Sequence, residues 1–537
     1  MRFEKKFEIF LFVVFLLFSL WLMHKSFGYN RQTHQLRVAR HQIGDFGLHL
    51  GLIRSFSLGH TNPAQSPFFP GPSLSYHYGL DFIVGQLERI GVPIDIALNG
   101  ISALFFSIVL LAVYQLSQLL FGQSYSIGIV AVLLSIFDSS VSFFDYIKNK
   151  PLSIQLFKEI WRIPDYIHKG PSDGSLVSLF FTLNVYLNQR HLIAAIALSL
   201  MITLFFVRRI FAGKSISYTS LMLLGFLYGF TTRLHSLIFL GTVIAIVCMM
   251  LLFRKTKWIA PFIIPLGIVA SFHVREIVMQ TSWQTDRQFF ALGFLAPQPL
   301  TLFNFLSFWF ANLGLKLLII PAVFLFANTK QKKIFLCFFV LFLLANILKL
   351  GFRVEHNQSL IQQFLLVANI YVAGILVRLW QRSHVGKSLA LLSLVVLTAS
   401  GVINLMVVKN DFQYSVPDYH SSPFMNWIVR STNPDAVFLS RQTIFDPVVI
   451  AGRKNYFGST YYSEVMGYNY GPRRVRAKQF FEAASVEDLA AARAARINYL
   501  VIPNHEVTDF FYDVHQDFLE SHLPIVYSDT DVSVYEL

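Results

Sequence analysis

The segment that decides the fold class lies near the start of the chain, from Phe7 to His24, and consists of FEIFLFVVFLLFSLWLMH. A helix of about 20 mostly apolar residues is long enough to cross the hydrocarbon core of a bilayer. Arg2, Lys5 and Lys6 precede the segment, as in a signal sequence, but no small-residue cleavage pattern follows it. We therefore interpret it as an uncleaved first membrane span.

Similar apolar runs recur along the first three quarters of the chain. They lie at 97–121, 126–144, 191–210, 218–232, 235–253, 258–274, 303–327, 334–350, 360–379 and 388–408. The chain of 537 residues is 54% hydrophobic and 14% charged, whereas a typical soluble domain is about 25% charged. Soluble globular, disordered and fibrous proteins are therefore excluded. The sequence predicts a polytopic α-helical membrane protein with about eleven spans.

The net charge of +14 is unevenly distributed along the chain. Residues 410–537 carry a net charge of −6, so residues 1–409 carry +20. No soluble segment combines a stripe of Lys and Arg with aromatic residues, which argues against a nucleic-acid partner. We predict a transmembrane domain over 1–409 and a separate C-terminal domain over 410–537.

Short basic loops predict the orientation in the membrane, because cytoplasmic loops are enriched in Lys and Arg. With a cytoplasmic N-terminus, about eleven spans place four basic clusters on the cytoplasmic side. These are Arg208, Arg209 and Lys214; Arg254, Lys255 and Lys257; Lys330, Lys332 and Lys333; and Arg378, Arg382 and Lys387. The prediction is a multi-pass protein of the cytoplasmic (plasma) membrane. Its first loop (25–96), its segment 145–174 and its C-terminal domain are then extracytoplasmic.

The loop 25–96 is too long for a simple connection, since loops above about 12–15 residues are usually functional or disordered. The spacing of apolar residues from Gly44 to Arg54 predicts an amphipathic helix that lies on the membrane, and a second such helix is predicted near 80–92. Asp45 and His49 are four residues apart and share one helical face. Asp45 is our candidate general base or metal ligand; its structural alternative is a carboxylate that stabilises the helix dipole. His49 and His77 are also candidate functional residues, and the alternative for each is a structural role.

Ionisable residues at membrane depth are energetically costly and are functional candidates for that reason. Arg190 and His191 follow Asn188-Gln189, and Arg233 and His235 flank Leu234, each pair at the outer end of an apolar run. Guanidinium groups match pairs of phosphate oxygens, so such arginines suit a lipid phosphate. Snorkelling to the membrane surface is the alternative. The outer half of the spans carries these further ionisable residues: Asp138, Asp145, His273, Arg275, Glu355 and His356.

The C-terminal segment has the pattern of a small α/β domain. Strands are predicted at 435–440 and 497–502, a helix from Ser485 to about Arg496, and a hairpin over 524–536. The alternation of helix and strand indicates an α/β layer. The segment contains no Gly-rich phosphate loop and no nucleophile elbow.

These features together resemble the GT-C superfamily of integral-membrane glycosyltransferases, in its bacterial members. The resemblance rests on the long first outer loop with its early acid in Gly44-Asp45-Phe46-Gly47-Leu48-His49, on Asn188-Gln189-Arg190-His191-Leu192, and on the outer C-terminal domain. Such enzymes transfer a sugar from a polyprenyl phosphate. The resemblance implies a hexosyl- or pentosyltransferase of cell-envelope glycan or glycolipid synthesis that inverts the anomeric carbon. The acceptor hydroxyl would belong to a glycan, a lipid or a protein.

In this interpretation Asp45 is the catalytic base. Substrate binding is assigned to His49, His77, Arg190, His191, Arg233, His235 and Arg275. A divalent metal, Mg²⁺ or Mn²⁺, is the candidate cofactor, and a second acid or metal ligand would come from Asp138, Asp145 or Asp165.

Two other classes remain as alternatives. A lipid-linked-sugar flippase or transporter also needs polar groups inside its spans, but it would favour internal repeats, and none is evident. A membrane scaffold or sensor would use the C-terminal domain to bind a ligand and would not depend on Asp45.

Overall fold

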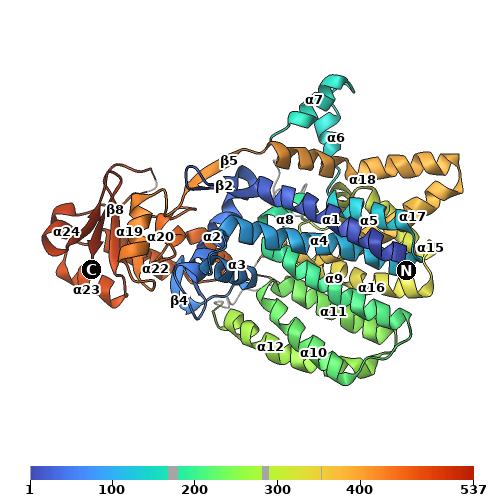
Figure 1. Ribbon diagram of the computed structural model, residues 1–537, viewed down its shortest axis with the longest axis horizontal. Coiled ribbons are helices and arrows are strands. Elements are labelled where there is room, and N and C mark those ends of the chain that lie inside the picture. The colour runs from blue at the N-terminus through green and yellow to red at the C-terminus, as the bar shows by residue number, and fades with distance from the viewer. Residues whose placement is uncertain (1, 167–179, 281–288, 352, 509) are drawn as a thin grey trace. The chain divides into compact units, whose positions relative to one another are not determined.

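The computed structural model describes residues 2–166, 180–280, 289–351, 353–508 and 510–537 (Figure 1). The chain forms two compact units. Unit 1 contains Met1–Lys25, Ile101–Ser271 and Thr285–Phe412, and unit 2 contains Ser26–Gly100, Phe272–Gln284 and Gln413–Leu537. The predicted boundary near residue 409 lies close to one of these divisions, but the first long loop folds with the C-terminal segment and not with the transmembrane helices.

Unit 1 is built from apolar helices around α17 (Gln358–Arg382), which packs against α5, α11, α16 and α18. Its helices are α1 (Arg2–Ser26), α4 (Ile94–Phe121), α5 (Tyr125–Ile136), α6 (Ser142–Ile147), α7 (Ile154–Arg162), α8 (Thr182–Asn188), α9 (Arg190–Phe211), α10 (Tyr218–Gly229), α11 (Ser236–Leu252), α12 (Ile259–Gln280), α13 (Leu302–Leu313), α14 (Leu315–Ile319), α15 (Val323–Phe326), α16 (Thr329–Ala345), α17 and α18 (His384–Asn410). The start of α4, up to Gly100, and the end of α12, from Phe272, belong to unit 2. Of the predicted outer segment 145–174, the residues up to Tyr166 are described.

Within the described residues, six helices are long and apolar enough to cross a membrane, or up to seven if a bent pair forms one span. The chain is thus a multi-pass membrane protein, but this count is below the predicted eleven. The predicted spans 126–144 and 218–232 correspond to α5 and α10, which have only 12 residues each. The spans 235–253 and 334–350 correspond to α11 and α16, with 17 residues each. Apolar composition therefore overestimated the length of regular helix for α5, α10 and α11, whereas α16 begins before the predicted span and has the same length.

The predicted single span 303–327 is broken. The helical segments Leu302–Leu313 and Leu315–Phe326 meet at an angle of 111°, and Gly314 between them has φ +56°, a backbone conformation that glycine adopts most readily. Non-helical backbone at membrane depth is tolerated where protein surrounds it. Here the break places Lys316 in the interior of the unit.

Lys316 forms a buried ion pair with Asp138, which follows the end of α5. The second carboxylate oxygen of Asp138 accepts a hydrogen bond from Nδ2 of Asn369 on α17, at 2.7 Å. Both charges are buried, and a buried charge is tolerated only when it is paired and hydrogen-bonded. The pair therefore links three segments in the interior of unit 1.

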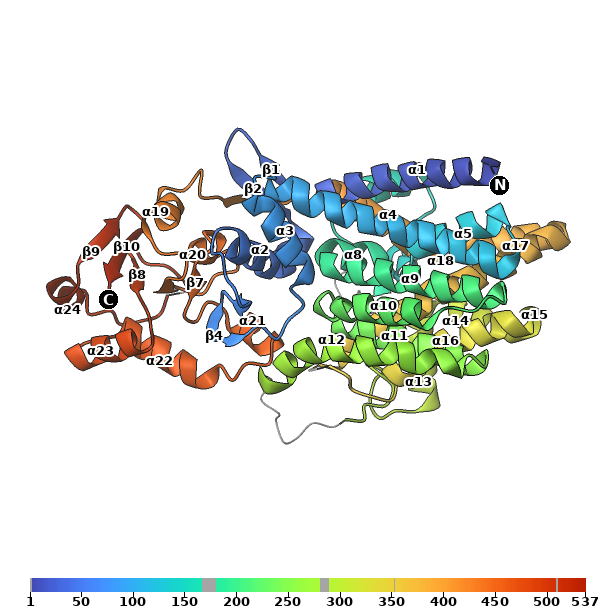
Figure 2. The ribbon, with the colours of Figure 1, turned by 60° about the horizontal axis from the view of Figure 1, so that its bottom comes forward.

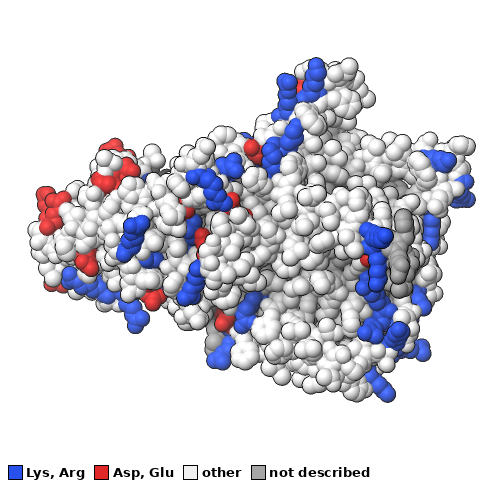
Figure 3. Space-filling view, in the orientation of Figure 1, with Lys and Arg blue, Asp and Glu red and all other residues white. Residues whose placement is uncertain are grey.

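The four basic clusters lie at one end of unit 1. Lys330 stacks over Phe211, Lys333 donates a hydrogen bond to the carbonyl of Leu252, and Arg378 lies over Phe121. The start of α1 lies at this end as well, because Gln115 bonds both Glu8 and Arg208. Figure 3 shows Lys and Arg gathered at the end of unit 1 that carries the N-terminus. The basic loops thus share one side, as the sequence predicts.

Unit 2 joins the first loop to the C-terminal segment through a three-stranded antiparallel sheet. Strand β2 (Gln35–Ala39) pairs with β1 (Phe27–Asn30) on one side and with β5 (Gln413–Pro417) on the other. The remaining elements of the first loop are α2 (Ile43–Ser57), β3 (Gln65–Ser66), β4 (Phe69–Ser73) and α3 (Gly79–Arg89). Residues almost 380 positions apart in the chain are therefore neighbours in this sheet.

The C-terminal part of unit 2 contains a five-stranded sheet in the order β7-β6-β8-β10-β9 (Figure 2). Strands β6, β7 and β8 are parallel, and β10 runs antiparallel to β8 and β9. The elements are α19 (Pro423–Ser431), β6 (Val437–Leu439), α20 (Pro447–Ile450), β7 (Lys454–Asn455), α21 (Thr460–Val465), α22 (Gly471–Phe481), α23 (Val486–Ala494), β8 (Tyr499–Pro503), α24 (Gln516–His522), β9 (Ile525–Ser528) and β10 (Val532–Glu536). Ser485 caps α23 as its sequence predicts, with its hydroxyl accepting from the Asp488 N–H.

The helix expected over 44–54 is present as α2, but the prediction that it lies on the membrane as an amphipathic helix is wrong. Residues 46–57 are all buried, and α2 packs between α3 and α20 of its own unit (Figure 2). Leu48 and Leu52 belong to one hydrophobic core with Val449, Tyr462 and Leu500. The polar face of the helix is buried because its charged residues find partners elsewhere in unit 2.

Arg54 is the main example of a charged residue of α2 that has partners elsewhere in unit 2. Its guanidinium bonds Asp418 at 2.9 Å and Glu88 of α3 at 3.2 Å, and it lies over the ring of Tyr419. Burial lowers the pKa of Arg54, but the two carboxylates raise it by more, so the group stays charged. This network fixes α2 to α3 and to the segment after β5.

We predict that Arg54→Met strongly lowers the unfolding temperature of the purified protein. Removing one partner of a buried ion pair typically costs about 3–5 kcal/mol, whereas an exposed pair contributes about 0–1 kcal/mol. Arg31→Met is the matched control, since Arg31 pairs with Asp95 but its side chain is 52% exposed. Thermal unfolding followed by fluorescence compares the two. Equal unfolding temperatures for both variants would contradict the structural role of Arg54.

Candidate functional site

The first turns of two helices in unit 2 place Asp45, the candidate base, in a cluster of polar side chains. Asp45 lies in the first turn of α2, and His49 follows one turn later on the same face. Asp81 lies in the first turn of α3, and its carboxylate is 2.9 Å from Nδ1 of His49. We call Asp45, His49, Asp81 and the neighbouring Tyr76 and Tyr462 the α2 site.

The start of α2 is held by the C-terminal part of the unit. The hydroxyl of Tyr462 donates a hydrogen bond of 2.6 Å to the carbonyl of Gly44. A Cβ atom on Gly47 would lie 2.5 Å from that hydroxyl and 2.6 Å from Ile444. Only glycine allows the helix to approach this closely, so the sequence Gly44-Asp45-Phe46-Gly47 positions Asp45 against Tyr462.

The side chains of the α2 site differ in how far they are exposed to solvent. Asp45 is half-buried, whereas His49 and Asp81 are buried, with 5% and 1% of their surface exposed. Asp45 can therefore be reached by another molecule, while the His49–Asp81 pair supports it from the interior. The ring of Tyr76 lies beside His49, with ring centroids 6.2 Å apart.

Burial dominates the electrostatics of the site. It raises the pKa of Asp45, and His49 opposes this rise only in part. Burial likewise raises the pKa of Asp81, again opposed by His49. The pKa of Tyr76 is raised well above its ordinary value by burial and by the negative charges of Asp45 and Asp81, which keeps its hydroxyl protonated. A carboxylate with a raised pKa is a stronger base than an ordinary aspartate.

His77 belongs to the same unit, in the segment between β4 and α3. It is half-buried, and its ring lies against that of Tyr76 with centroids 4.9 Å apart. Arg275 lies on α12 and is exposed. The structure thus brings three predicted residues, Asp45, His49 and His77, around Tyr76.

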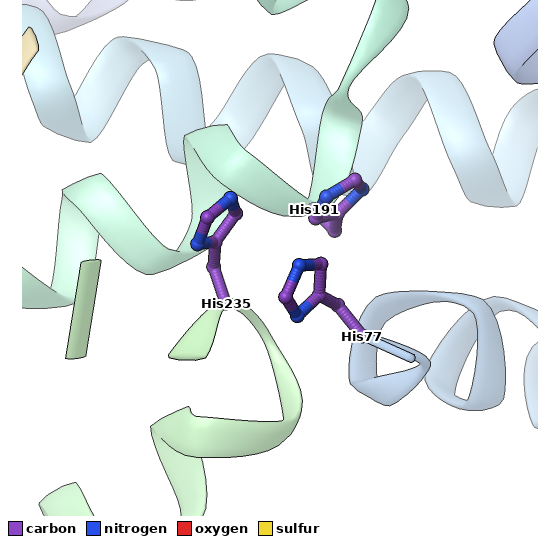
Figure 4. Close-up of side chains that lie close together, drawn as sticks. All are labelled: His77, His191 and His235. Atoms are coloured by element: carbon purple, nitrogen blue, oxygen red, sulfur yellow. The ribbon is translucent and has the colours of Figure 1, made fainter. Parts of the chain in front are cut away.

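The other predicted histidines form a second cluster, within unit 1. The rings of His191, at the start of α9, and His235, just before α11, are stacked with centroids 5.6 Å apart (Figure 4). Nδ1 of His235 accepts from the N–H of Ile238, and Nε2 is 3.4 Å from Oγ of Ser359. This pattern assigns the proton of a neutral His235 to Nε2. His77, which Figure 4 also labels, belongs to unit 2.

The two predicted arginines of unit 1 differ in their surroundings. Arg190 is buried at the start of α9, and its guanidinium donates to the carbonyls of Leu187 and Met23. Arg233 is half-buried at the end of the short 3₁₀ helix Phe230–Arg233. Their assignment to a donor phosphate remains a prediction from the sequence.

The candidates for a second acid all lie in unit 1. Asp138 is engaged by Lys316 and Asn369. Asp145 is exposed and pairs with Lys148 at 3.0 Å, and Asp165 is half-buried. The acid that accompanies Asp45 within unit 2 is Asp81, which the sequence reasoning did not select.

The described residues of unit 2 do not assemble a ligand set for a divalent ion. Among the described residues of this unit, no three His, Cys, Asp or Glu side chains gather their ligand atoms, and the carboxylate of Asp81 is already bonded to His49. Mg²⁺ needs near-octahedral oxygen ligands, which Asp45 alone does not supply. We therefore derive no chemical step through a metal.

Three residues of the α2 site were missed by sequence reasoning: Tyr76, Asp81 and Tyr462. Asp81 carried a local signal, because it occupies the same first-turn position in the second predicted helix that Asp45 occupies in the first. Tyr462 carried none, since its contact with Gly44 spans 418 residues.

No protein-family model matches the chain, and no curated protein matches it. Among solved structures, the chain is similar to the oligosaccharyltransferase of Archaeoglobus fulgidus in the apo form, with a TM-score of 0.45, 13% identity, and coverage of 93% of this chain and 70% of that chain. The same enzyme tethered to an acceptor peptide with the NVT sequon gives a TM-score of 0.45, 13% identity, and coverage of 93% and 69%. The archaeal oligosaccharyltransferase AglB of A. fulgidus, in complex with an inhibitory peptide and a dolichol-phosphate, gives a TM-score of 0.42 and 13% identity. The match covers 94% of this chain and 70% of that chain. Matches at this level do not assign an activity to the chain.

We predict that Asp45→Asn unfolds at the same temperature as the unchanged protein or at a higher one. The pKa of Asp45 is raised in the folded state, so its ionisation opposes folding. This destabilisation is absent below the ordinary aspartate pKa, develops as pH rises through the folded-state pKa, and is complete above it. The advantage of Asp45→Asn should therefore grow as pH rises from the ordinary aspartate pKa through the raised pKa of the folded state. Thermal unfolding across this range measures it, and a variant that is less stable at every pH would refute the assignment.

Proposed function

We propose that this chain is a membrane glycosyltransferase that moves a sugar from a polyprenyl-phosphate donor to an acceptor hydroxyl, with Asp45 as the general base. The observation that carries the proposal is the α2 site. It combines a reachable carboxylate of raised pKa with a buried His49–Asp81 pair, whose histidine lies one helical turn further along α2. Perturbed carboxylates of this kind are concentrated at catalytic sites.

The chemistry assigned to Asp45 is proton transfer. The acceptor O–H donates its proton to the Asp45 carboxylate while the oxygen forms a bond to the anomeric carbon of the sugar. The bond from that carbon to the phosphate oxygen breaks, and its electron pair leaves with the polyprenyl phosphate. Attack from the face opposite the leaving group inverts the anomeric carbon. General-base catalysis of this kind typically contributes about 10²–10⁴-fold to the rate.

His49 and Asp81 act as positioning residues in this scheme. The bond of 2.9 Å between them fixes the imidazole of His49, and the imidazole in turn lowers the pKa of Asp45 toward its ordinary range. His49 therefore favours the ionised form of the Asp45 carboxylate, which is the form that can accept a proton. The neutral hydroxyl of Tyr76 is a hydrogen-bond donor or acceptor for the same region.

A membrane location suits a lipid-linked donor, and the shared basic end of unit 1 supports the orientation. We propose that this end is cytoplasmic by the excess of Lys and Arg, with the N-terminus on that side and the C-terminal domain outside. Arg190, Arg233 and Arg275 remain our candidates for the donor phosphate. The acceptor is a glycan, a lipid or a protein.

The buried pair of Lys316 and Asp138 favours one alternative. Charges inside a helical bundle mark substrate or ion pathways in transporters, so a flippase for lipid-linked sugars is the second candidate. The two functions differ in what a deletion strain accumulates. Loss of a transferase leaves donor on the outer leaflet with a truncated glycan, whereas loss of a flippase confines donor to the inner leaflet.

We expect Asp45→Asn to abolish sugar transfer, by about 10²-fold or more, without loss of expression. Asp435→Asn is the matched control, because Asp435 belongs to the same unit, its side chain is 79% exposed and it pairs with Lys454 at 2.9 Å. The measurement is transfer of sugar from lipid-linked donor to acceptor by protein reconstituted in vesicles, or restoration of the glycan in a deletion strain. Full activity of Asp45→Asn would remove Asp45 from the reaction.

A further inference from the structure

A cavity of about 350 Å³ lies in the C-terminal part of unit 2, at one edge of the five-stranded sheet. Ser440 and Arg441, which directly follow β6, line it together with Pro503 and His505 at the end of β8. The turn between β9 and β10 closes its rim. The cavity is therefore at the carboxyl ends of two neighbouring parallel strands.

The topology of the sheet makes this edge a natural binding position. Strand β6 lies between β7 and β8, and it is parallel to both. The chain leaves β6 toward β7 on one side and later returns to β8 on the other, so the strand order reverses at β6. In open α/β sheets, ligands bind in the crevice at the carboxyl ends of the strands where the order reverses.

The cavity wall combines apolar surface with a polar rim. Phe424 of α19, Ile450 of α20 and Val501 of β8 are buried and supply the apolar part. Arg441, His505 and Asp531 lie at the more exposed side. Its volume is at the lower end of the range of roughly 300–1,000 Å³ for small-molecule sites, which suits a ligand of one or two rings.

The charges at the cavity select among ligand classes. Three carboxylates, of Asp446, Asp529 and Asp531, line it against the cationic Arg441 and one histidine. Asp446 is buried and already accepts hydrogen bonds from Ser440 and the N–H of Val448. An anionic ligand would be repelled by Asp529 and Asp531, and a purely apolar ligand would leave the polar rim desolvated. A cationic ligand would meet the guanidinium of Arg441 in the same cavity. A neutral polyhydroxylated ring suits this mixed lining, since its hydroxyls donate to carboxylates and its C–H faces pack on Phe424.

We propose that this cavity binds a neutral saccharide of one or two rings. The biological role of that saccharide rests on the proposed function: as part of the acceptor, it would be held by the C-terminal domain before transfer. Binding itself needs neither donor nor catalysis, so it is measurable independently of Asp45.

The test is saturation-transfer NMR on the full chain in lipid nanodiscs. The probes are methyl glucoside, methyl galactoside, methyl mannoside and their disaccharides, with glucuronic acid and glucosamine as anionic and cationic comparisons. Val532→Trp fills the cavity from the start of β10, and Val526→Trp is its matched control, because Val526 is a half-buried valine of the same hairpin outside the lining. Asp531→Asn, with Asp517→Asn as control, removes the negative charge of a rim carboxylate and replaces one of its acceptor oxygens by an amide donor.

We expect saturation transfer to at least one neutral sugar, with affinity reduced about tenfold or more in Val532→Trp and weakened in Asp531→Asn. Val526→Trp, Asp517→Asn and Asp45→Asn should bind as the unchanged chain does. Absence of neutral-sugar binding, retained binding in both cavity variants, or preference for glucuronic acid or glucosamine would overturn the inference. Retained binding in Asp45→Asn together with unimpaired transfer would refute the proposed catalytic role but leave the cavity assignment intact.

Discussion

The burial of α2 from Phe46 to Ser57 is the constraint on which unit 2 depends. Charged side chains in this buried part of the helix have to find partners within the protein. Arg54 pairs with Glu88 and Asp418, and His49 pairs with Asp81. These two sets of contacts fix α3 on one side and the segment after β5 on the other. The first loop and the C-terminal segment consequently form one unit.

The same constraint separates what the sequence could predict from what it could not. Local patterns were sufficient for α2, α3, α23 and the C-terminal hairpin, because apolar spacing and capping residues act within a few positions. The membrane-surface interpretation of α2 failed because its polar face is covered by partners as distant as Asp418, 364 residues from Arg54. No local pattern encodes such a contact.

The membrane spans of unit 1 were also predictable only in part. Apolar composition located helices at each predicted position, but it did not predict the bend at Gly314 or the short α5 and α10. Gly314 and Lys316 in the run 303–327 were the available signals for the break. The partner of Lys316, Asp138, was selected for a different reason, as a possible second acid, and the pairing depends on tertiary structure. For the α2 site, the sequence predicted Asp45 and His49 but not Asp81, since their contact depends on how α2 packs against α3.

The central claim is that Asp45 acts as a base whose pKa is set by burial and moderated by His49. The pH–rate profile of sugar transfer tests it most directly, in the unchanged protein and in His49→Gln, whose amide can still donate to Asp81. Activity should fall as pH decreases through the raised pKa of Asp45, and this acid limb should move to higher pH in His49→Gln, because the cation that lowers the pKa is lost. An acid limb at the same pH in both proteins would contradict the account.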